Sequence, residues 1–185
     1  MAKALFIQKK DITRFTAANG SIDTDKLLPY IDMAQDIDIQ RLLGSKLYDK
    51  ISADITAAPQ TLTGDYLTLV DTYIKPTLIH YALMYALPYL SVTIGNGGVY
   101  RNNPENATAL TSEEIDKMVE KERDAAQYYS TRMIDFLNFN ASSMFPEYYT
   151  NSNDDISPDY EDTFGGWVIN YNYGSYKRIG TSSKE

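Results

Sequence analysis

The sequence predicts a mainly α fold: a helical bundle with a small β-hairpin and an extended C-terminal arm that carries one strand. Three observations support this prediction. Apolar residues recur at helical spacing over most of the first 140 positions. A glycine-rich turn interrupts them once, near residue 96. Residues 150–185 then lose the helical period. We therefore expect a helical domain at residues 1–149 and an extended arm at residues 150–185.

Four helical segments are expected in the first domain. The first helix is expected over residues 24–43, and Asp23 or Thr24 can cap its N-terminus. Gly44 suits the end of that helix, and Ser45 can cap a short second helix over residues 45–57. An apolar third helix follows over residues 65–91, and a fourth over residues 112–140.

Two local signals refine the last two helices. Pro76 should kink or divide the third helix, because proline removes a backbone donor and crowds the preceding turn. The run Thr111-Ser112-Glu113-Glu114 has the pattern of a capping box, which predicts the start of the fourth helix.

Between the third and fourth helices, two short β-prone runs flank Gly95-Asn96-Gly97-Gly98, which predicts a hairpin at residues 92–101. In the arm, residues 150–164 hold several acidic residues and no basic one, as an extended linker does. Aromatic and polar residues then alternate, which is typical of a strand with one apolar face.

The strand predicted at residues 165–176 needs a partner, because a single strand cannot satisfy its own backbone groups. Addition to the sheet edge of a neighbouring protein is favoured, and pairing with the hairpin or with the residues near Leu5 of its own chain is the alternative. The predicted partner-binding residues are Trp167, Ile169, Tyr171 and Tyr173.

The composition excludes several kinds of chemistry. Cysteine is absent and His80 is the only histidine, so thiol nucleophiles, Cys/His zinc sites and most histidine relays are excluded. For His80, a hydrogen-bonded core or interface histidine is favoured over a general base. We expect no catalytic residue, no cofactor and no metal.

The acidic residues of the first long helix offer one competing interpretation. Asp32 and Asp36 lie four residues apart on one helix face, and with Asp38 they could hold a hard cation for a hydrolase. A solvated helix face is favoured, because no further ligand follows at a fixed spacing.

Charge and aromatic content indicate contact surfaces rather than nucleic-acid binding. The chain has 25 acidic and 17 basic residues and a net charge of −8, which disfavours binding through phosphate neutralisation. Its 16 tyrosines are a residue type typical of protein interfaces. The apolar stretch at residues 78–90 is shorter than the roughly 20 residues of a membrane span, and no signal peptide is evident near residue 4. We expect no membrane association.

The helix–glycine–helix at residues 31–51 resembles that of head-to-tail connector proteins, the adaptor or ring proteins of tailed bacteriophages. A kinked apolar helix, a glycine-bearing hairpin, a capped long helix and a closing segment at residues 140–149 follow in that family's order. The resemblance extends over roughly residues 10–149. The sequence pattern is most similar to that of ring proteins of crAss-like phages of Bacteroidales.

The resemblance implies a structural virion protein at the head–tail junction, present in the bacterial host cytoplasm during assembly. Its subunits would form a homo-oligomeric ring, twelve-fold by resemblance, that joins the portal protein to the tail or to further ring proteins. The ring would line the DNA channel without sequence-specific binding, and no catalysis is implied. A negative charge suits such a conduit, because a basic lumen would retain phosphates. Contacts of residues 150–185 are not implied, because the short members of the family lack this arm.

The alternative is a soluble helical DNA-binding or regulatory protein, in which residues 24–43 and 45–57 form a helix-turn-helix. A recognition helix is normally basic. Residues 45–57 instead carry two lysines against two aspartates, which disfavours this alternative.

Overall fold

The computed structural model describes residues 4–18, 22–101, 110–149 and 155–158. Helices make up most of this part of the chain, and its two strands form one antiparallel hairpin. The predicted mainly α fold is therefore confirmed. The strand predicted at residues 165–176 lies outside the described residues.

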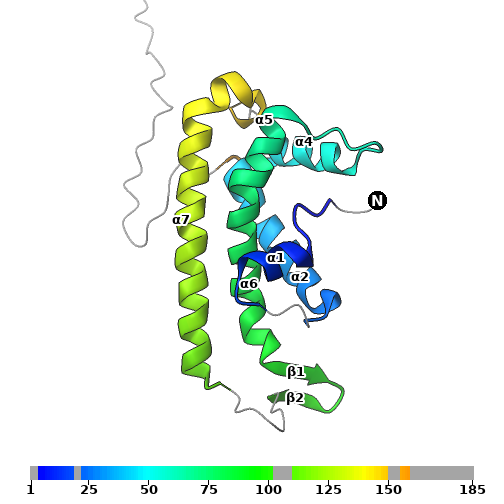
Figure 1. The fold of residues 1–185 in the computed structure, drawn as a ribbon, viewed down its shortest axis with the longest axis vertical. Helices are drawn as coiled ribbons and strands as arrows, with labels where there is room; N and C mark the ends of the chain where they lie inside the picture. Colours follow the sequence, from blue (N-terminus) through cyan, green and yellow to red (C-terminus); the bar gives the residue numbers. More distant parts are fainter. Residues whose placement is uncertain (1–3, 19–21, 102–109, 150–154, 159–185) are drawn as a thin grey trace, which may run out of the picture.

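Two long antiparallel helices, α6 (Lys75–Leu90) and α7 (Ser112–Met144), run side by side along the longest axis (Figure 1). The helix α2 (Thr24–Ala34) packs against α6. The core between these helices is apolar, with fully buried side chains such as Leu78 and Met133. This packing provides most of the burial that stabilises the domain.

The helix predicted at residues 24–43 is present, but it contains a wider π-helical turn. It consists of α2, the π-turn η1 (Gln35–Ile39) and α3 (Gln40–Leu43). Asp23 occupies the N-cap position of α2 without a side-chain cap hydrogen bond. A π-turn inserts an extra residue into a helix, so it shifts which side chains face the core.

A glycine separates this helix from α4 (Ser45–Thr56), as the sequence predicts. Gly44 has φ 73° and ψ 156°, in a region where a Cβ atom is unfavourable. The N-cap residue of α4 is Gly44, so the expectation that Ser45 caps this helix is wrong. Ser45 is the first helical residue, and its hydroxyl accepts a hydrogen bond from a distant segment instead.

The third predicted helix is not divided at Pro76. It runs as α5 (Gly64–Leu69), the π-turn η2 (Val70–Ile74) and α6 without interruption. Pro76 lies in the first turn of α6, directly after the π-turn. We attribute the continuity to this widened turn, which accommodates both the missing donor and the proline ring.

The hairpin is confirmed, with β1 (Val92–Gly95) paired to β2 (Gly98–Arg101) in a register that sets Gly95 opposite Gly98. The capping box is also confirmed: the Thr111 hydroxyl accepts from the Glu114 amide, and the Glu114 carboxylate accepts from the Thr111 amide. Helix α7 extends four residues past the predicted end at Asn140, and the short 3₁₀ helix η3 (Pro146–Tyr148) follows it.

One helix was not expected from the sequence. The short α1 (Lys9–Phe15) follows an N-terminal segment in which Phe6 and Ile7 are buried. That segment is fixed by Gln35 from the first π-turn, which accepts from the Phe6 amide at 3.0 Å and donates to the Ala4 carbonyl at 2.7 Å. In the part of the chain that the structure describes, no helix is both long and apolar enough to cross a membrane.

Candidate interaction surfaces

The four residues predicted to bind a partner, Trp167, Ile169, Tyr171 and Tyr173, lie outside the described residues. What the structure does describe is the root of their arm. Residues 155–158 lie against the junction between α3 and α4, more than one hundred positions away in the sequence.

The contact at this junction is reciprocal. The Ser45 amide donates to the Ile156 carbonyl at 3.0 Å, and the Ile156 amide donates to the Ser45 hydroxyl at 3.1 Å. Pro158 is buried beside Gly44. No signal in the sequence predicts this contact, because the acidic segment around it has the composition of a linker.

The hairpin presents apolar side chains to solvent. Ile94 is 68% exposed and Val99 is 66% exposed, and the two residues face each other across the strands. Tyr100 on the second strand is also exposed. A two-stranded hairpin with uncovered apolar side chains has little stability of its own, so these residues are candidates for contact with another protein.

A hollow at the base of the hairpin continues this surface onto α2. It is lined by Tyr30, Tyr89 and Ile94, among others. The rings of Tyr30 and Tyr89 stack with centroids 5.3 Å apart, which joins α2 to the end of α6. Flat aromatic surfaces that are half wet are typical of interfaces.

The outward face of α7 carries a second set of exposed aromatic residues. Phe139 is 85% exposed and Tyr128 is 66% exposed. They lie eleven residues apart, which is three helical turns and therefore the same face of the helix. This spacing was visible in the sequence, and it could have shown that α7 has an aromatic stripe opposite its core face.

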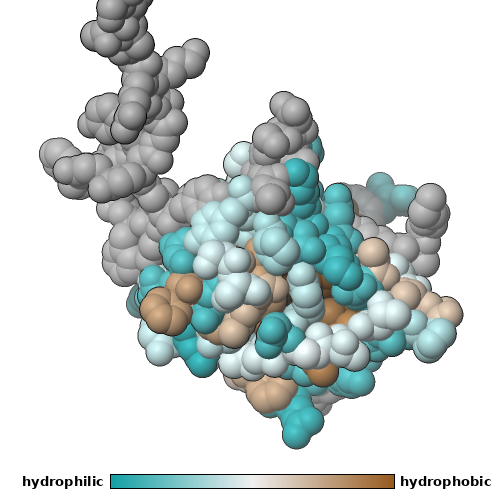
Figure 2. All heavy atoms as spheres, turned by 90° about the horizontal axis from the view of Figure 1, so that it is seen from above, coloured by the Kyte–Doolittle hydropathy of each residue, from teal (hydrophilic) through white to brown (hydrophobic). Residues whose placement is uncertain are grey.

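The end of the molecule that carries α4 and η3 has no single large apolar surface in view. Figure 2 shows that end with hydrophobic residues as separate patches between hydrophilic ones. Separate patches with polar surroundings are what non-obligate protein interfaces contain.

His80 is hydrogen-bonded, as the favoured interpretation expected. Its Nδ1 atom lies 2.7 Å from the Glu122 carboxylate on α7, and its ring stacks on Tyr129. The histidine borders a hollow that Arg14, Phe15 and Lys75 also line. The contact joins α6 to α7, and we assign a structural role to the His80 and Glu122 pair.

The interpretation of Asp32, Asp36 and Asp38 as one solvated face is wrong for Asp38. Asp36 is exposed and accepts from the Tyr48 hydroxyl at 3.2 Å, whereas Asp38 is 6% exposed on the other side of the helix. The π-turn contains both residues, and it is the packing of this turn on α6 that buries one of them. Among the described residues no group of three or more acidic or histidine side chains could hold a metal ion.

Burial controls the ionisation of this aspartate. It raises the pKa of Asp38 to about 6, although the hydrogen bond from Tyr85 and the charge of Arg41 act in the opposite direction. Within the described residues, Oδ2 of Asp38 has no hydrogen-bond partner. The pKa of Tyr85 rises to about 12, first through burial and then through the neighbouring carboxylate.

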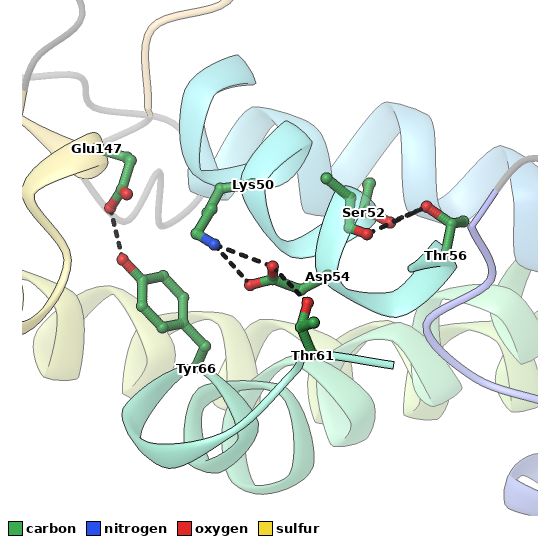
Figure 3. Close-up of polar contacts among 8 residues, drawn as sticks. Lys50, Ser52, Asp54, Thr56, Thr61, Tyr66 and Glu147 are labelled. Atoms are coloured by element: carbon green, nitrogen blue, oxygen red, sulfur yellow. Dashed lines mark hydrogen bonds and ion pairs between the residues drawn. The ribbon is translucent and has the colours of Figure 1, made fainter. Parts of the chain in front are cut away.

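A cluster of polar side chains lies at the end of the bundle that carries α4, α5 and η3 (Figure 3). Lys50 forms an ion pair with Asp54 at 2.9 Å, and Asp54 also accepts from the Thr61 hydroxyl. Tyr66 on α5 donates to Glu147 in η3 at 2.8 Å. These bonds connect α4 to the following loop and α5 to η3, and we assign them a structural role.

Comparison with known proteins places the chain in a family. The model of a family of unknown function, DUF6712, matches residues 39–157, which is more than half of the chain. The chain belongs to the DUF6712 family. No curated protein and no solved structure matches it. The DUF6712 match begins in the first π-turn and ends within the segment docked on Gly44, so it contains both sides of that contact.

Proposed function

We propose that this protein is a structural virion subunit that forms an oligomeric ring between the portal and the tail of a bacteriophage. The ring lines the channel through which DNA passes, at the head–tail junction. Its subunits are present in the bacterial cytoplasm during assembly, and they bind one another, the portal protein and the tail or further ring proteins.

The order of the elements is the observation that carries this proposal. The resemblance to connector proteins depends on a helix–glycine–helix, a kinked apolar helix, a hairpin, a capped long helix and a closing segment. The fold contains these elements in that order, from α2 through Gly44 and α4 to α6, the hairpin, α7 and η3. The apolar helix differs in that a π-turn carries it past Pro76 without a division. A common order of elements supports a shared fold more than any single motif does.

The surface gives independent support. Ile94 and Val99 on the hairpin and Phe139 on α7 expose apolar area that a monomer would leave in water. The hairpin and the end of α7 lie at opposite ends of the molecule (Figure 1). A ring subunit needs such contact surfaces at both ends, because its neighbours lie above and below as well as beside it.

No described side chain cluster offers a better account. The His80 and Glu122 pair has no nucleophile assigned to it. Lys50 is paired with Asp54, and Tyr66 donates to Glu147. For the DNA-binding alternative, α4 is the second helix of the pair, and its Lys50 is already paired with Asp54. We therefore propose a role in contacts rather than catalysis.

The solution mass of the purified chain tests the proposal. Over a concentration series, we expect a transition from subunits of 20.9 kDa to a closed ring, seen as annular particles by negative-stain electron microscopy. Addition of the cognate portal protein should favour the ring by mass action. A chain that remains monomeric at high concentration with the portal present would contradict the proposal.

A further inference from the structure

Residues 155–158 are held where α3 meets α4, although they belong to a segment with the composition of a linker. We infer that Gly44 and Ser45 form an anchor for the C-terminal arm, so that the arm reaches its partner from this junction. The consequence for assembly rests on the proposed function, in which the arm docks on a neighbouring protein. The anchor itself does not depend on that function.

Ser45 contributes both of the hydrogen bonds that hold the segment. Its amide donates to the Ile156 carbonyl at 3.0 Å, and its hydroxyl accepts from the Ile156 amide at 3.1 Å. This exchange satisfies both backbone groups of Ile156, as a pair of residues does in a sheet. Gln40 donates to the same hydroxyl at 3.3 Å, which orients it from α3.

Gly44 leaves room for the ring of Pro158 to pack against the helix junction. A Cβ atom at this position would lie 2.6 Å from Cδ of Pro158, closer than real Cβ contacts allow, and 3.0 Å from its Cγ, which is a tight contact. The glycine is therefore required twice, once for its φ of 73° and once for the approach of Pro158. A junction that only reversed the chain direction between two helices would need a residue with positive φ, but it would not need room for Pro158.

The extent of the family match supports the anchor. The DUF6712 match ends at residue 157, eight positions past Tyr149 and inside the docked segment. The match therefore includes residues 155–157 as part of the same unit as α3 and α4. We infer that the free arm starts after Pro158 rather than at residue 150.

This starting point limits the reach of the arm. From Pro158, only residues 159–164 precede the strand predicted at residues 165–176, and at about 3.3 Å per residue they extend about 20 Å. Counted from residue 150, the reach would be about 50 Å. The acceptor strand must therefore lie on a protein in direct contact with the α3–α4 side of this subunit. A short tether also raises the effective concentration of the arm at that site.

Two glycine substitutions separate the anchor from backbone strain. Gly44 and Gly64 both have positive φ, at 73° and 60°, and a Cβ atom on Gly64 would meet nothing within 4 Å. Gly44→Ala and Gly64→Ala each place an alanine at a positive φ, but only the first displaces Pro158. Hydrogen exchange of the Ile156 amide in the full chain should become about tenfold faster in Gly44→Ala and change less than about threefold in Gly64→Ala.

A second pair of variants keeps the test valid if Gly44→Ala fails to fold. Ser45→Ala removes the acceptor of the Ile156 amide, and its exchange should accelerate while that of the core helices does not. Pro158→Ala removes the two atoms nearest to the built Cβ. In that background, Gly44→Ala should have about one third or less of its effect on exchange, because the two positions are in contact.

The outcomes distinguish the anchor from the proposed function. Unchanged exchange at Ile156 in both Gly44→Ala and Ser45→Ala would overturn the anchor, whatever the state of assembly. Additive effects of Gly44→Ala and Pro158→Ala would overturn it as well. Faster exchange with loss of ring assembly supports the anchor and its consequence. Faster exchange with unchanged assembly supports the anchor and counts against the role of the arm in the ring.

Discussion

Single polar residues buried in the first π-turn decide how the N-terminal half of the domain is held. Gln35 is fully buried and makes three hydrogen bonds, to the Phe6 amide, the Ala4 carbonyl and the Tyr48 hydroxyl. It thus joins the N-terminal segment, the first long helix and α4. Buried polar groups are costly when they lose their partners, so this position should be sensitive to substitution.

Gln35→Met should destabilise the domain by about 2 to 4 kcal/mol, because it leaves the Phe6 amide and the Ala4 carbonyl buried without a partner. Urea unfolding measures this change, and hydrogen exchange should accelerate at Phe6. Gln60→Met, at an exposed glutamine, is the control and should be nearly neutral. Equal effects of the two substitutions would contradict the role of Gln35.

Asp38 gives the fold a specific pH dependence. Its pKa is raised to about 6 in the folded state, mainly by burial, whereas an aspartate in an unfolded chain has a pKa of about 3.9. Between these values the folded state binds more protons than the unfolded state. The contribution of Asp38 to stability is therefore full below about pH 4 and is lost as the pH rises through 6.

Asp38→Asn should remove the loss of folding stability at higher pH, because asparagine does not ionise. It keeps a side-chain oxygen that accepts from the Tyr85 hydroxyl. At pH 7.5 the variant should be more stable than the natural chain by on the order of 2 kcal/mol, and the difference should shrink toward pH 4.5. Urea unfolding of both chains across this range measures it. A difference that does not vary with pH would show that Asp38 is not the titrating group.

At the level of elements, the two π-turns occupy corresponding places in their helices, each between two α-helical segments. Each precedes a helical segment that packs in the core, η1 before α3 and η2 before α6. The first brings Gln35 and Asp38 into the interior, and the second allows the chain to pass Pro76 without a break. Extra residues within a helix change its facing side chains, so these turns determine which polar groups are buried.

The capping box determines where α7 begins. Thr111 and Glu114 each satisfy a backbone amide of the other. The Glu114 carboxylate accepts hydrogen bonds from both the amide and the hydroxyl of Thr111, which lower the pKa of Glu114. Thr111→Ala should reduce the free energy of unfolding by about 1 kcal/mol. Hydrogen exchange should also accelerate in the first turn of α7. Thr111→Ser keeps the hydroxyl and should be close to neutral, and a similar loss in both variants would exclude the cap as the cause.

The hairpin should matter for assembly rather than for folding. Ile94 and Val99 are about two thirds exposed, so Ile94→Lys with Val99→Lys should leave the helical content and unfolding midpoint nearly unchanged. In the proposed ring, the pair of charges would weaken assembly or portal binding, because buried charges without partners are costly. Ile94→Val with Val99→Ile keeps the surface apolar and is the matched control. Assembly that is equal in both double variants would place the hairpin outside the contacts.

For the molecule as a whole, the arm and the body should be separable. The described residues form a bundle with its own apolar core. Deletion of residues 165–185 should leave the circular dichroism and the unfolding midpoint unchanged. It should weaken incorporation into virions or binding to the portal and its neighbours, measured by pull-down or by ring mass. Normal assembly of the truncated chain would contradict the predicted role of Trp167 and the alternating residues after it.

The helical domain is predictable from the sequence, because the signals that specify it are local. Apolar spacing, Gly44, the capping box at Thr111 and the glycine-rich turn near residue 96 each act within a few residues. These features predict the helices and the hairpin without knowledge of their neighbours. The short α1 was missed because its few residues have no clear apolar period and depend on burial against α6.

The roles of residues that depend on distant partners become evident only in the folded chain. The burial of Asp38 depends on packing against Tyr85 on α6, the role of Gln35 on the N-terminal segment, and the role of Ser45 on Ile156. In the sequence, Ser45 has the pattern of a helix cap and residues 155–158 have that of a linker. Long-range contacts replace such local preferences when burial and hydrogen bonding in the folded chain are worth more than a local cap.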